Sequence, residues 1–409
     1  MTDLQHVLRE ATDHVASPDL AGRALVAAHR TRVRRASAGA LAAVVLLGGG
    51  AAWAVQDRVP HAEVVDTPVP TPTATPTVRG TDEAGGTQPV WDPFTVVDEP
   101  RFDSVLRNDL DPPASPPSVL DQPVPAAVLA WPEEGRDLRL LSPGGEWRAV
   151  PGTASVAAST LRPVISPAIS SDGRLVAFAA EEGLWVVDVA TGERRVLAWP
   201  EEIAAPSDTL PAVQWMAGDD AVLVHHWDTP WIMGLDGSDE DASYLGRYTA
   251  SVAVDPDGAL LQRDFRSGSL LTWRDGEVVH RTDDGIAWGE RMVAGPGMVA
   301  LTGGLGGGAY AGPVVVDTAT GALVAYAPIE EPSSEYSDNG HLTAQGFLDE
   351  DTLLLLVAPV RFGKETRGGD EWHLVAWEFR TGGFQIVASG DTRMRDVAVA
   401  VGLVATPTP

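Results

Sequence analysis

The chain has 409 residues, and its 57 acidic against 29 basic residues give a formal net charge of −28. A charge of this sign repels the phosphates of nucleic acids, so we expect no nucleic-acid partner. The sequence contains no cysteine. This excludes disulfides, thiolate–zinc sites, a cysteine nucleophile and a lipid-modified cysteine, so any membrane anchor must be a helix.

Residues 1–35 are predicted to form a short helical segment in the cytoplasm. Its first apolar residues recur at three- and four-residue spacing, at Leu4, Val7, Leu8, Ala11 and Val15. This spacing is typical of an amphipathic helix, whose apolar stripe would lie on the membrane surface or bind a cytoplasmic protein. The triplet Ser17-Pro18-Asp19 then supplies a cap, a proline for the first helical position and an early acid, which predicts a second helix from Leu20 to Arg35.

Residues 36–55 are predicted to cross the membrane once. They carry no charge, and a helix of this length covers roughly 30 Å at about 1.5 Å per residue. Arginines precede the segment at Arg30, Arg32, Arg34 and Arg35. The positive-inside rule therefore keeps the N-terminus cytoplasmic and places the rest of the chain outside. The alternative is a cleaved signal peptide, because Ala52-Trp53-Ala54 fits a small-x-small processing site, but the long region before the apolar core favours the anchor.

Residues 56–125 are predicted to be a stalk followed by a strap. The stalk is rich in proline and threonine, with Thr71 to Thr77 at its centre, and this composition favours an extended chain that builds no core. Between Trp91 and Leu110 the chain has enough large apolar residues to dock on a neighbouring domain. Prolines return between Pro112 and Pro125, so we expect an ordered strap there rather than a domain.

From residue 126 onward, short apolar runs alternate with Gly, Asp and Pro turns at intervals typical of propeller blades. The clearest copy runs from Pro167 to Phe178, then through Leu184 to Asp188 and the turn Thr191-Gly192-Glu193 to Val196-Leu197. It predicts four strands joined by three turns. The copy resembles the repeat of TolB-like and WD40-like propellers, and the resemblance covers residues 126 to 405. It implies the fold and says little about activity.

Six copies of the third strand of a blade are found. They are Leu138 to Leu141, Leu184 to Val187, Trp231 to Leu235, Leu270 to Trp273, Val314 to Val316 and Leu374 to Trp377. The first copy, Ala126 to Val150, has only about three strands, whereas Val397 to Val401 is a spare apolar run. We expect the two ends to share one blade, which removes exposed sheet edges. The predicted fold class is therefore all-β: a six-bladed β-propeller with circular closure over residues 126–409, preceded by a short helical cytoplasmic segment and one transmembrane helix.

No catalytic constellation is found in the sequence. There is no Gly-x-Ser-x-Gly string for a serine hydrolase, and His225 and His226 would point to opposite faces of a strand. The run Gly303 to Gly308 follows a predicted strand, Met298 to Leu301, but no helix follows it to bind phosphate, so a flexible loop is predicted. Asp-Gly pairs at 257–258 and 275–276 and Thr-Gly pairs at 320–321 and 381–382 are predicted to be tight turns.

Two acidic stretches are candidates for ligand recognition. Residues 282–288 resemble a degenerate Asp-box turn of sialidase propellers, and that box is itself structural. Asp236, Asp239, Glu240 and Asp241 form an acidic loop whose spacing fits no calcium-binding pattern, so a solvated turn is expected. Lactonase-type propellers hold a metal with Asn and Asp side chains, and this chain has only two asparagines. We therefore expect no catalytic, cofactor-binding or metal-binding residues, no cofactor, and no enzyme activity.

The predicted function is that of a single-pass protein of the cell membrane whose extracytoplasmic propeller binds an envelope protein or ligand. The layout, including the segment Pro18 to Leu25, resembles membrane-anchored propeller proteins of actinobacteria. One alternative is a transmembrane regulator of anti-sigma type with a cytoplasmic protein partner at residues 1–35, although the His and Cys zinc ligands of such domains are missing. Another is a propeller-type extracellular hydrolase or lyase with an unrecognised acidic site.

Overall fold

A computed structural model of the chain describes residues 98–133, 135–155, 167–201, 203, 211–225, 230–246, 252–264, 267–283, 286–305, 312–328, 342–358, 372–390 and 397–405. The predicted cytoplasmic segment at 1–35, the predicted membrane span at 36–55 and the stalk lie outside these residues. Within them, no helix has the length and apolar character that crossing a bilayer requires. The following description concerns the propeller and the strap.

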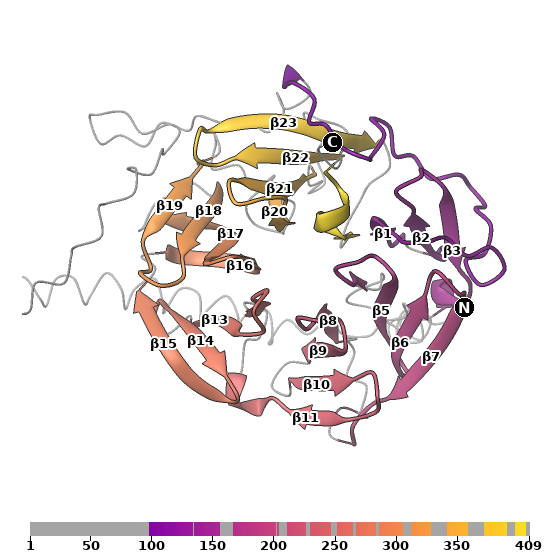
Figure 1. The fold of residues 1–409 in the computed structure, drawn as a ribbon, viewed down its shortest axis with the longest axis horizontal. Coiled ribbons are helices and arrows are strands. Elements are labelled where there is room, and N and C mark those ends of the chain that lie inside the picture. The colour runs from indigo at the N-terminus through magenta and orange to yellow at the C-terminus, as the bar shows by residue number, and fades with distance from the viewer. Residues whose placement is uncertain are drawn as a thin grey trace, which may run out of the picture. The chain divides into compact units, whose positions relative to one another are not determined.

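The described strands form six four-stranded antiparallel sheets set around a common axis, as the ring in Figure 1 shows. In chain order they are β1 (Leu129–Trp131), β2 (Leu138–Leu141), β3 (Trp147–Val150), β4 (Ala168–Ile169), β5 (Leu175–Ala180), β6 (Gly183–Asp188), β7 (Glu193–Ala198), β8 (Ala212–Trp215), β9 (Ala221–His225), β10 (Trp231–Gly234), β11 (Asp239–Asp241), β12 (Val252–Val254), β13 (Leu260–Asp264), β14 (Ser269–Arg274), β15 (Glu277–Asp283), β16 (Ile286–Gly295), β17 (Met298–Leu305), β18 (Gly312–Asp317), β19 (Leu323–Tyr326), β20 (Leu342–Phe347), β21 (Thr352–Val357), β22 (Trp372–Glu378), β23 (Gly383–Gly390) and β24 (Ala398–Val399). Three short 3-10 helices accompany them, namely η2 (Thr153–Ser155), η3 (Ser243–Leu245) and η5 (Val401–Leu403).

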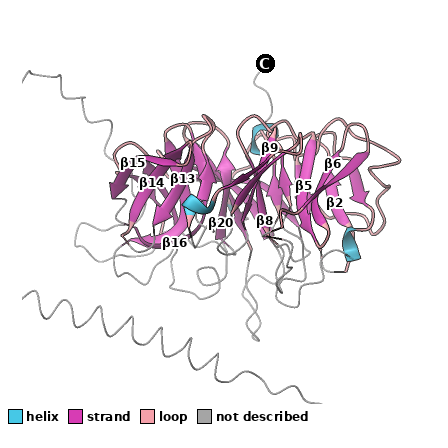
Figure 2. Ribbon diagram, turned by 90° about the horizontal axis from the view of Figure 1, so that it is seen from below, coloured by secondary structure: helices cyan, strands magenta, loops and turns pink. Residues whose placement is uncertain are grey.

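Each sheet is one blade, and the six predicted third strands are confirmed. They are β2, β6, β10, β14, β18 and β22, and each lies third from the axis in its sheet. Blades 2 to 6 are built from consecutive strands, β4–β7, β8–β11, β12–β15, β16–β19 and β20–β23. Figure 2 shows the blades side on, with connecting loops on two opposite faces.

The middle strands of a blade are apolar on both faces because each blade packs between two others. In blade 2, Val176 and Phe178 of β5 pack with residues of blade 1. Ala177, which lies between them, packs with Trp215 and Val222 of blade 3. Alternate residues of one strand thus enter different interfaces, which explains why these strands read as continuous apolar runs rather than as an alternation.

The predicted circular closure is confirmed. Blade 1 has the order β24-β1-β2-β3, so its innermost strand comes from the C-terminal end of the chain. β24 pairs with β1 in the register Leu129↔Val399 and Ala130↔Ala398. The inner edge of β1 is therefore paired, and the two-residue strand β24 becomes the innermost strand of the blade.

The strap, here residues 98–125, first lies along the outer edge of blade 6. Residues 100–102 and 108–110 exchange main-chain hydrogen bonds of 2.8 and 2.9 Å with Ile386 and Ser389 of β23. The two bridges to β23 are parallel. The strap thus covers the edge of β23.

The strap then joins blade 6 to the C-terminal segment and to blade 1. Val105 N donates to the carbonyl oxygen of Val404 at 2.9 Å. On blade 1, Ala149 N of β3 donates to Pro117 O, and Val119 N donates to Ala149 O, both at 2.8 Å. The junction between the first and last blades, called the seam below, is therefore held from inside by β24 and from outside by the strap.

The seam has an aromatic and aliphatic core. The rings of Trp131 in β1 and Trp372 in β22 meet edge to face, with centroids 5.2 Å apart, and both side chains are fully buried. Leu106 and Leu110 of the strap and Val404 are buried in the same cluster. Burying each of these apolar side chains contributes about 1.5–3 kcal/mol.

The run that begins at Gly303 is not a loop where it is described, and that prediction was wrong. β17 continues through Leu305 because strands on both sides accompany it: Gly303 is paired with Gly289 of β16 and with Gly312 of β18. Backbone partners on two sides hold the glycines in the sheet despite their low strand preference. Residues 306–308 lie outside the described part of the chain.

The acidic stretch near residue 240 is also more regular than predicted. Asp239, Glu240 and Asp241 form the outer strand β11, paired with β10, and all three are exposed. Only Asp236 lies in the turn, where its carboxylate accepts hydrogen bonds from the Ser238 hydroxyl and main chain. These bonds hold the pKa of Asp236 below its usual range. A charged outer strand discourages pairing with other chains.

The Asp-Gly and Thr-Gly turns are confirmed. In three blades the glycine N–H donates to the main-chain oxygen of an acid four residues earlier, in the pairs Gly192–Asp188, Gly321–Asp317 and Gly382–Glu378, at 2.8, 2.9 and 2.7 Å. Each of these glycines has φ between +70° and +79°, a region that a side chain disfavours. The turns are structural elements of the repeat.

Candidate functional site: a pocket beneath the strap

The strap crosses from blade 6 to blade 1 on a stretch rich in proline. Residues 112, 113, 116 and 117 are prolines, and proline has no N–H to donate to a sheet. Where such a residue does join the sheet, at Pro117, it contributes only its carbonyl oxygen. The crossing stretch therefore spans the gap between two sheet edges without pairing to either.

A pocket of about 390 Å³ lies beneath this crossing. Its walls come from the strap, from the turn between β1 and β2, and from β2, β3 and η2, and the lining residues are Ala114, Ser115, Pro116, Gly135, Arg136, Asp137, Arg139, Ala149 and Ala154. The volume lies within the range of small-molecule sites, about 300–1,000 Å³. Most of the lining side chains are small, so the two arginines dominate its chemistry.

Two guanidinium groups share one carboxylate at the pocket. Glu133 Oε1 lies 3.0 Å from Arg136 Nε, and its Oε2 lies 2.7 Å from Arg139 Nη1. Arg139 is only 4% exposed, whereas the side chain of Arg136 is 49% exposed. In the described part of the chain, Glu133 is the only side chain that pairs with the Arg139 guanidinium, which has five N–H donors. The group of three carries one excess positive charge.

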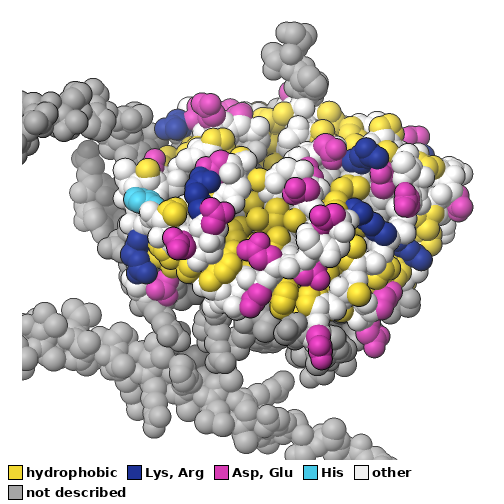
Figure 3. All heavy atoms as spheres, turned by 60° about the horizontal axis from the view of Figure 1, so that its bottom comes forward, with side chains coloured by type: hydrophobic (Ala, Val, Ile, Leu, Met, Phe, Trp, Pro, Cys, Tyr) yellow, Lys and Arg dark blue, Asp and Glu magenta, His cyan; other side chains and the backbone are white. Residues whose placement is uncertain are grey.

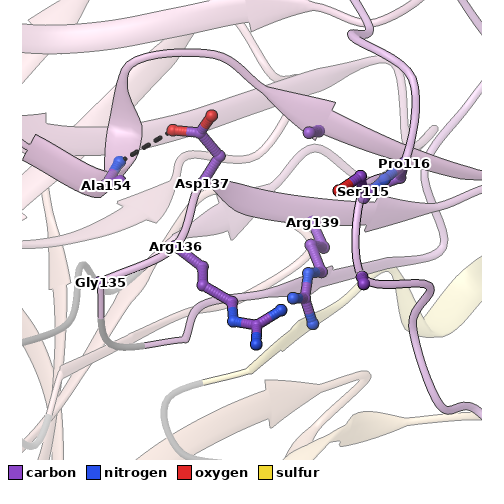
Figure 4. A pocket seen from close by; sticks show the side chains of 9 residues that line it. Ser115, Pro116, Gly135, Arg136, Asp137, Arg139 and Ala154 are labelled. Carbon is purple, nitrogen blue, oxygen red and sulfur yellow. Dashed lines mark hydrogen bonds between the residues drawn. The ribbon is translucent and has the colours of Figure 1, made fainter.

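The other acid of the pocket is directed elsewhere. Asp137 Oδ1 accepts a hydrogen bond of 3.0 Å from Ala154 N of η2. Figure 4 shows this carboxylate turned toward Ala154, while the guanidinium groups of Arg136 and Arg139 extend together in the opposite direction. Asp137 therefore fixes η2, and within the described residues it forms no ion pair with either arginine.

The environment of Arg139 raises the free energy of its charged form. Burial lowers the pKa of Arg139, the neighbouring Glu133 opposes this effect, and Arg136 adds to it. Arginine stays protonated in proteins even so. Burial of this cation makes its pairing with a carboxylate important for the stability of the charged form.

None of the acids or histidines singled out in the sequence lines this pocket. His225 ends β9, and His226 lies outside the described residues. Residues 282–283 end β15 and residues 286–288 begin β16. Among the described residues no group of three or more His, Cys, Asp or Glu side chains could hold a metal ion.

The sequence reasoning missed Glu133, Arg136 and Arg139. One signal was present: Arg139 interrupts the apolar run Leu138 to Leu141, so it had to lie inside a blade or in a special environment. The position of the strap over it was not readable, because residues 114–116 reach Arg139 only through the tertiary fold.

A second candidate is the pair His373 and Ser389 on neighbouring strands of blade 6. His373 Nδ1 lies 2.8 Å from Ser389 Oγ, and the two residues are opposite each other in β22 and β23. Burial lowers the pKa of His373 to about 4, so the neutral ring is a weak base at neutral pH. The pair joins two strands beneath the strap and provides little catalytic power.

Charged side chains of both signs lie side by side on one face of the propeller. Figure 3 shows acidic and basic groups interspersed with apolar ones over one face of the propeller. A second pocket, of about 440 Å³, is lined by Asp349, Glu350, Asp351, Thr352, Glu378, Arg380 and Thr381. Arg380 forms an ion pair with Asp351 there, so a cation in that pocket would face competition from the guanidinium.

No protein-family model matches the chain, and no curated protein matches it. Solved structures match by fold. Hydrazine synthase of Kuenenia stuttgartiensis is 14% identical with a TM-score of 0.37, over 54% of this chain and 64% of that one, so this chain spans less than two thirds of its length. A putative TolB from Agrobacterium tumefaciens is 9% identical with a TM-score of 0.38, over 54% and 79% of the two chains. The propeller domain of the Trilobed protease from Pyrococcus furiosus is 12% identical with a TM-score of 0.38, over 64% and 82%.

These likenesses concern the fold alone. The chain is a six-bladed β-propeller, and the structures similar to it include TolB-like propeller proteins.

Proposed function

We propose that the chain is a non-enzymatic binding module of the cell envelope, held at the membrane by the helix predicted at residues 36–55. The observation that carries the proposal is the pocket beneath the strap. It has a buried arginine, Arg139, beside the exposed Arg136, and guanidinium groups suit an anionic ligand. Its hydroxyl, Ser115, has no general base beside it among the described lining residues, because Asp137 is turned toward Ala154.

The strap supports an anchored arrangement. It follows the predicted stalk and pairs with both β23 and β3, so the stalk would join the propeller through an ordered segment rather than a free linker. A domain held in this way is presented to partners at a distance from the membrane that the stalk sets.

The proposal is tested by crosslinking the full-length protein in native membranes and identifying captured molecules, with a chain lacking residues 1–35 in parallel. Envelope partners that are captured by both chains support the binding module. A cytoplasmic partner that is lost with residues 1–35 would instead support the transmembrane regulator. A screen of purified protein for hydrolase and lyase turnover completes the test, because turnover that is lost in Arg136→Gln or Arg139→Met would contradict a non-enzymatic role.

A further inference from the structure

We propose that the pocket beneath the strap binds a carboxylate through Arg136 and Arg139, and that the bound carboxylate fastens the strap to blade 1. The first part names the ligand class of the proposed binding module and rests on that function. The second part assigns a regulatory consequence to the same site.

The guanidinium groups of the pocket can bind an anion. The chain as a whole is strongly acidic, with a formal net charge of −28, yet at this point two guanidinium groups are joined by one carboxylate. Arg139 is 4% exposed and lines the pocket. A buried guanidinium offers planar, paired N–H donors that match the two oxygens of a carboxylate.

The size and lining of the pocket restrict the rest of the ligand. Ala114, Pro116, Ala149 and Ala154 present small apolar surfaces, and Ser115 presents one hydroxyl. A carboxylate attached to a short aliphatic group fits this lining, whether it belongs to a small acid or to the end of a peptide. A bulky ligand would exceed the volume of about 390 Å³. A polyanionic ligand would leave its remaining charges without partners.

The two sides of the pocket belong to different parts of the fold. Ala114 and Ser115 belong to the strap and are exposed, whereas Arg139 lies on β2 and is buried. The strap is bonded to β3 at Pro117 and Val119, beyond the pocket. A ligand in contact with both sides adds a link where the strap otherwise makes no sheet pairing, so its binding free energy also stabilises strap docking.

The binding test uses the full-length protein in detergent and isothermal titration. The probes are butyrate, its neutral amide, inorganic phosphate, and acetyl-dialanine with a free or an amidated C-terminus. We expect saturable binding of butyrate or of the free peptide and none of the matching amide. Binding of phosphate alone, or of no probe at millimolar concentration, overturns the carboxylate assignment.

Variants of the arginine group test the residues. Arg136→Gln removes the exposed guanidinium without opening the core and is expected to weaken binding about tenfold. Glu133→Gln removes the competing carboxylate and is expected to tighten binding by a similar factor. Arg174→Gln is the matched control, because Arg174 is also an exposed, ion-paired arginine, bonded to Asp188 of blade 2. If Arg136→Gln and Glu133→Gln bind the ligand with the same affinity as the Arg174→Gln control, the site is refuted.

Hydrogen exchange tests the link to the strap. Saturating ligand is expected to slow exchange of the Ala114 and Ser115 amides severalfold, and not that of the Gly237 amide in blade 3. Binding with unchanged exchange at these two amides would remove the regulatory part of the proposal. The outcome is separable from that of the proposed function: captured envelope partners without carboxylate binding would retain the module and reject this pocket as its site.

Discussion

Acidification is expected to destabilise the propeller through the buried imidazole of His373. This side chain is 8% exposed, and burial lowers its pKa from the ordinary 6.5 to about 4. Between these values the unfolded chain binds a proton that the folded chain does not. The contribution of the neutral ring is therefore complete above pH 6.5 and is lost as the pH falls toward 4.

The size of the effect follows from the shift. One unit of pKa corresponds to about 1.4 kcal/mol. Relative to pH 7, the loss in unfolding free energy that is due to His373 is about 2 kcal/mol at pH 5 and about 3 kcal/mol at pH 4. Either value is a large part of the stability of a typical domain, about 5–15 kcal/mol.

The assay is urea denaturation of the full-length protein at pH 7, 5 and 4, with His373→Gln measured in parallel. Glutamine can retain a hydrogen bond to Ser389 but does not titrate. The difference between the two free energies isolates the histidine from the many carboxylates, which titrate in both proteins. If the difference in unfolding free energy between the two proteins stays constant within about 0.5 kcal/mol from pH 7 to pH 4, the reasoning is refuted. The titration of His373 alone should change this difference by about 3 kcal/mol over that range.

Three further outcomes are expected from the packing. Leu110→Ala, which truncates a strap side chain that is 2% exposed, should lower the unfolding free energy by about 2–5 kcal/mol in urea, and a loss below 1 kcal/mol would mean that the strap is not part of the core. Gly173→Ala should cost about 2 kcal/mol or more, because its φ is +75° and a Cβ would lie 2.6 Å from Ala127 O; an unchanged melting temperature would contradict this. Asp219→Ala removes the acceptor of hydrogen bonds from the Ser171 main chain and hydroxyl and should cost about 1 kcal/mol, which denaturation at pH 7 would show; a neutral result would make that link between blades 2 and 3 dispensable.

The blades were predictable because their signals are local. An apolar run and a turn pair such as Thr381-Gly382 lie within one hairpin, and the glycine φ of +79° is what the pair predicts. The closure was also predictable, although β1 and β24 are distant in sequence. An incomplete first copy and the spare run Val397 to Val401 complement each other only in a ring.

The parts that were missed depend on partners from elsewhere in the chain. β17 extends through Leu305 because β16 and β18 accompany it, and glycine-rich sequence alone predicts the opposite. The pocket requires the strap to cross above Arg139, so residue 115 must be placed near residue 139 by the fold. Local propensity carries no information on either point.

The seam determines when during synthesis the propeller can close. Blades 2 to 6 are each continuous in the chain, so each can form as soon as its own four strands are available. Blade 1 has to wait for β24, which is the last described strand, and until then the inner edge of β1 is unpaired. A chain that stops before Ala398 would keep its other blades yet expose the main-chain edge at Leu129 and Ala130, which makes premature termination a route to aggregation rather than to a smaller working protein.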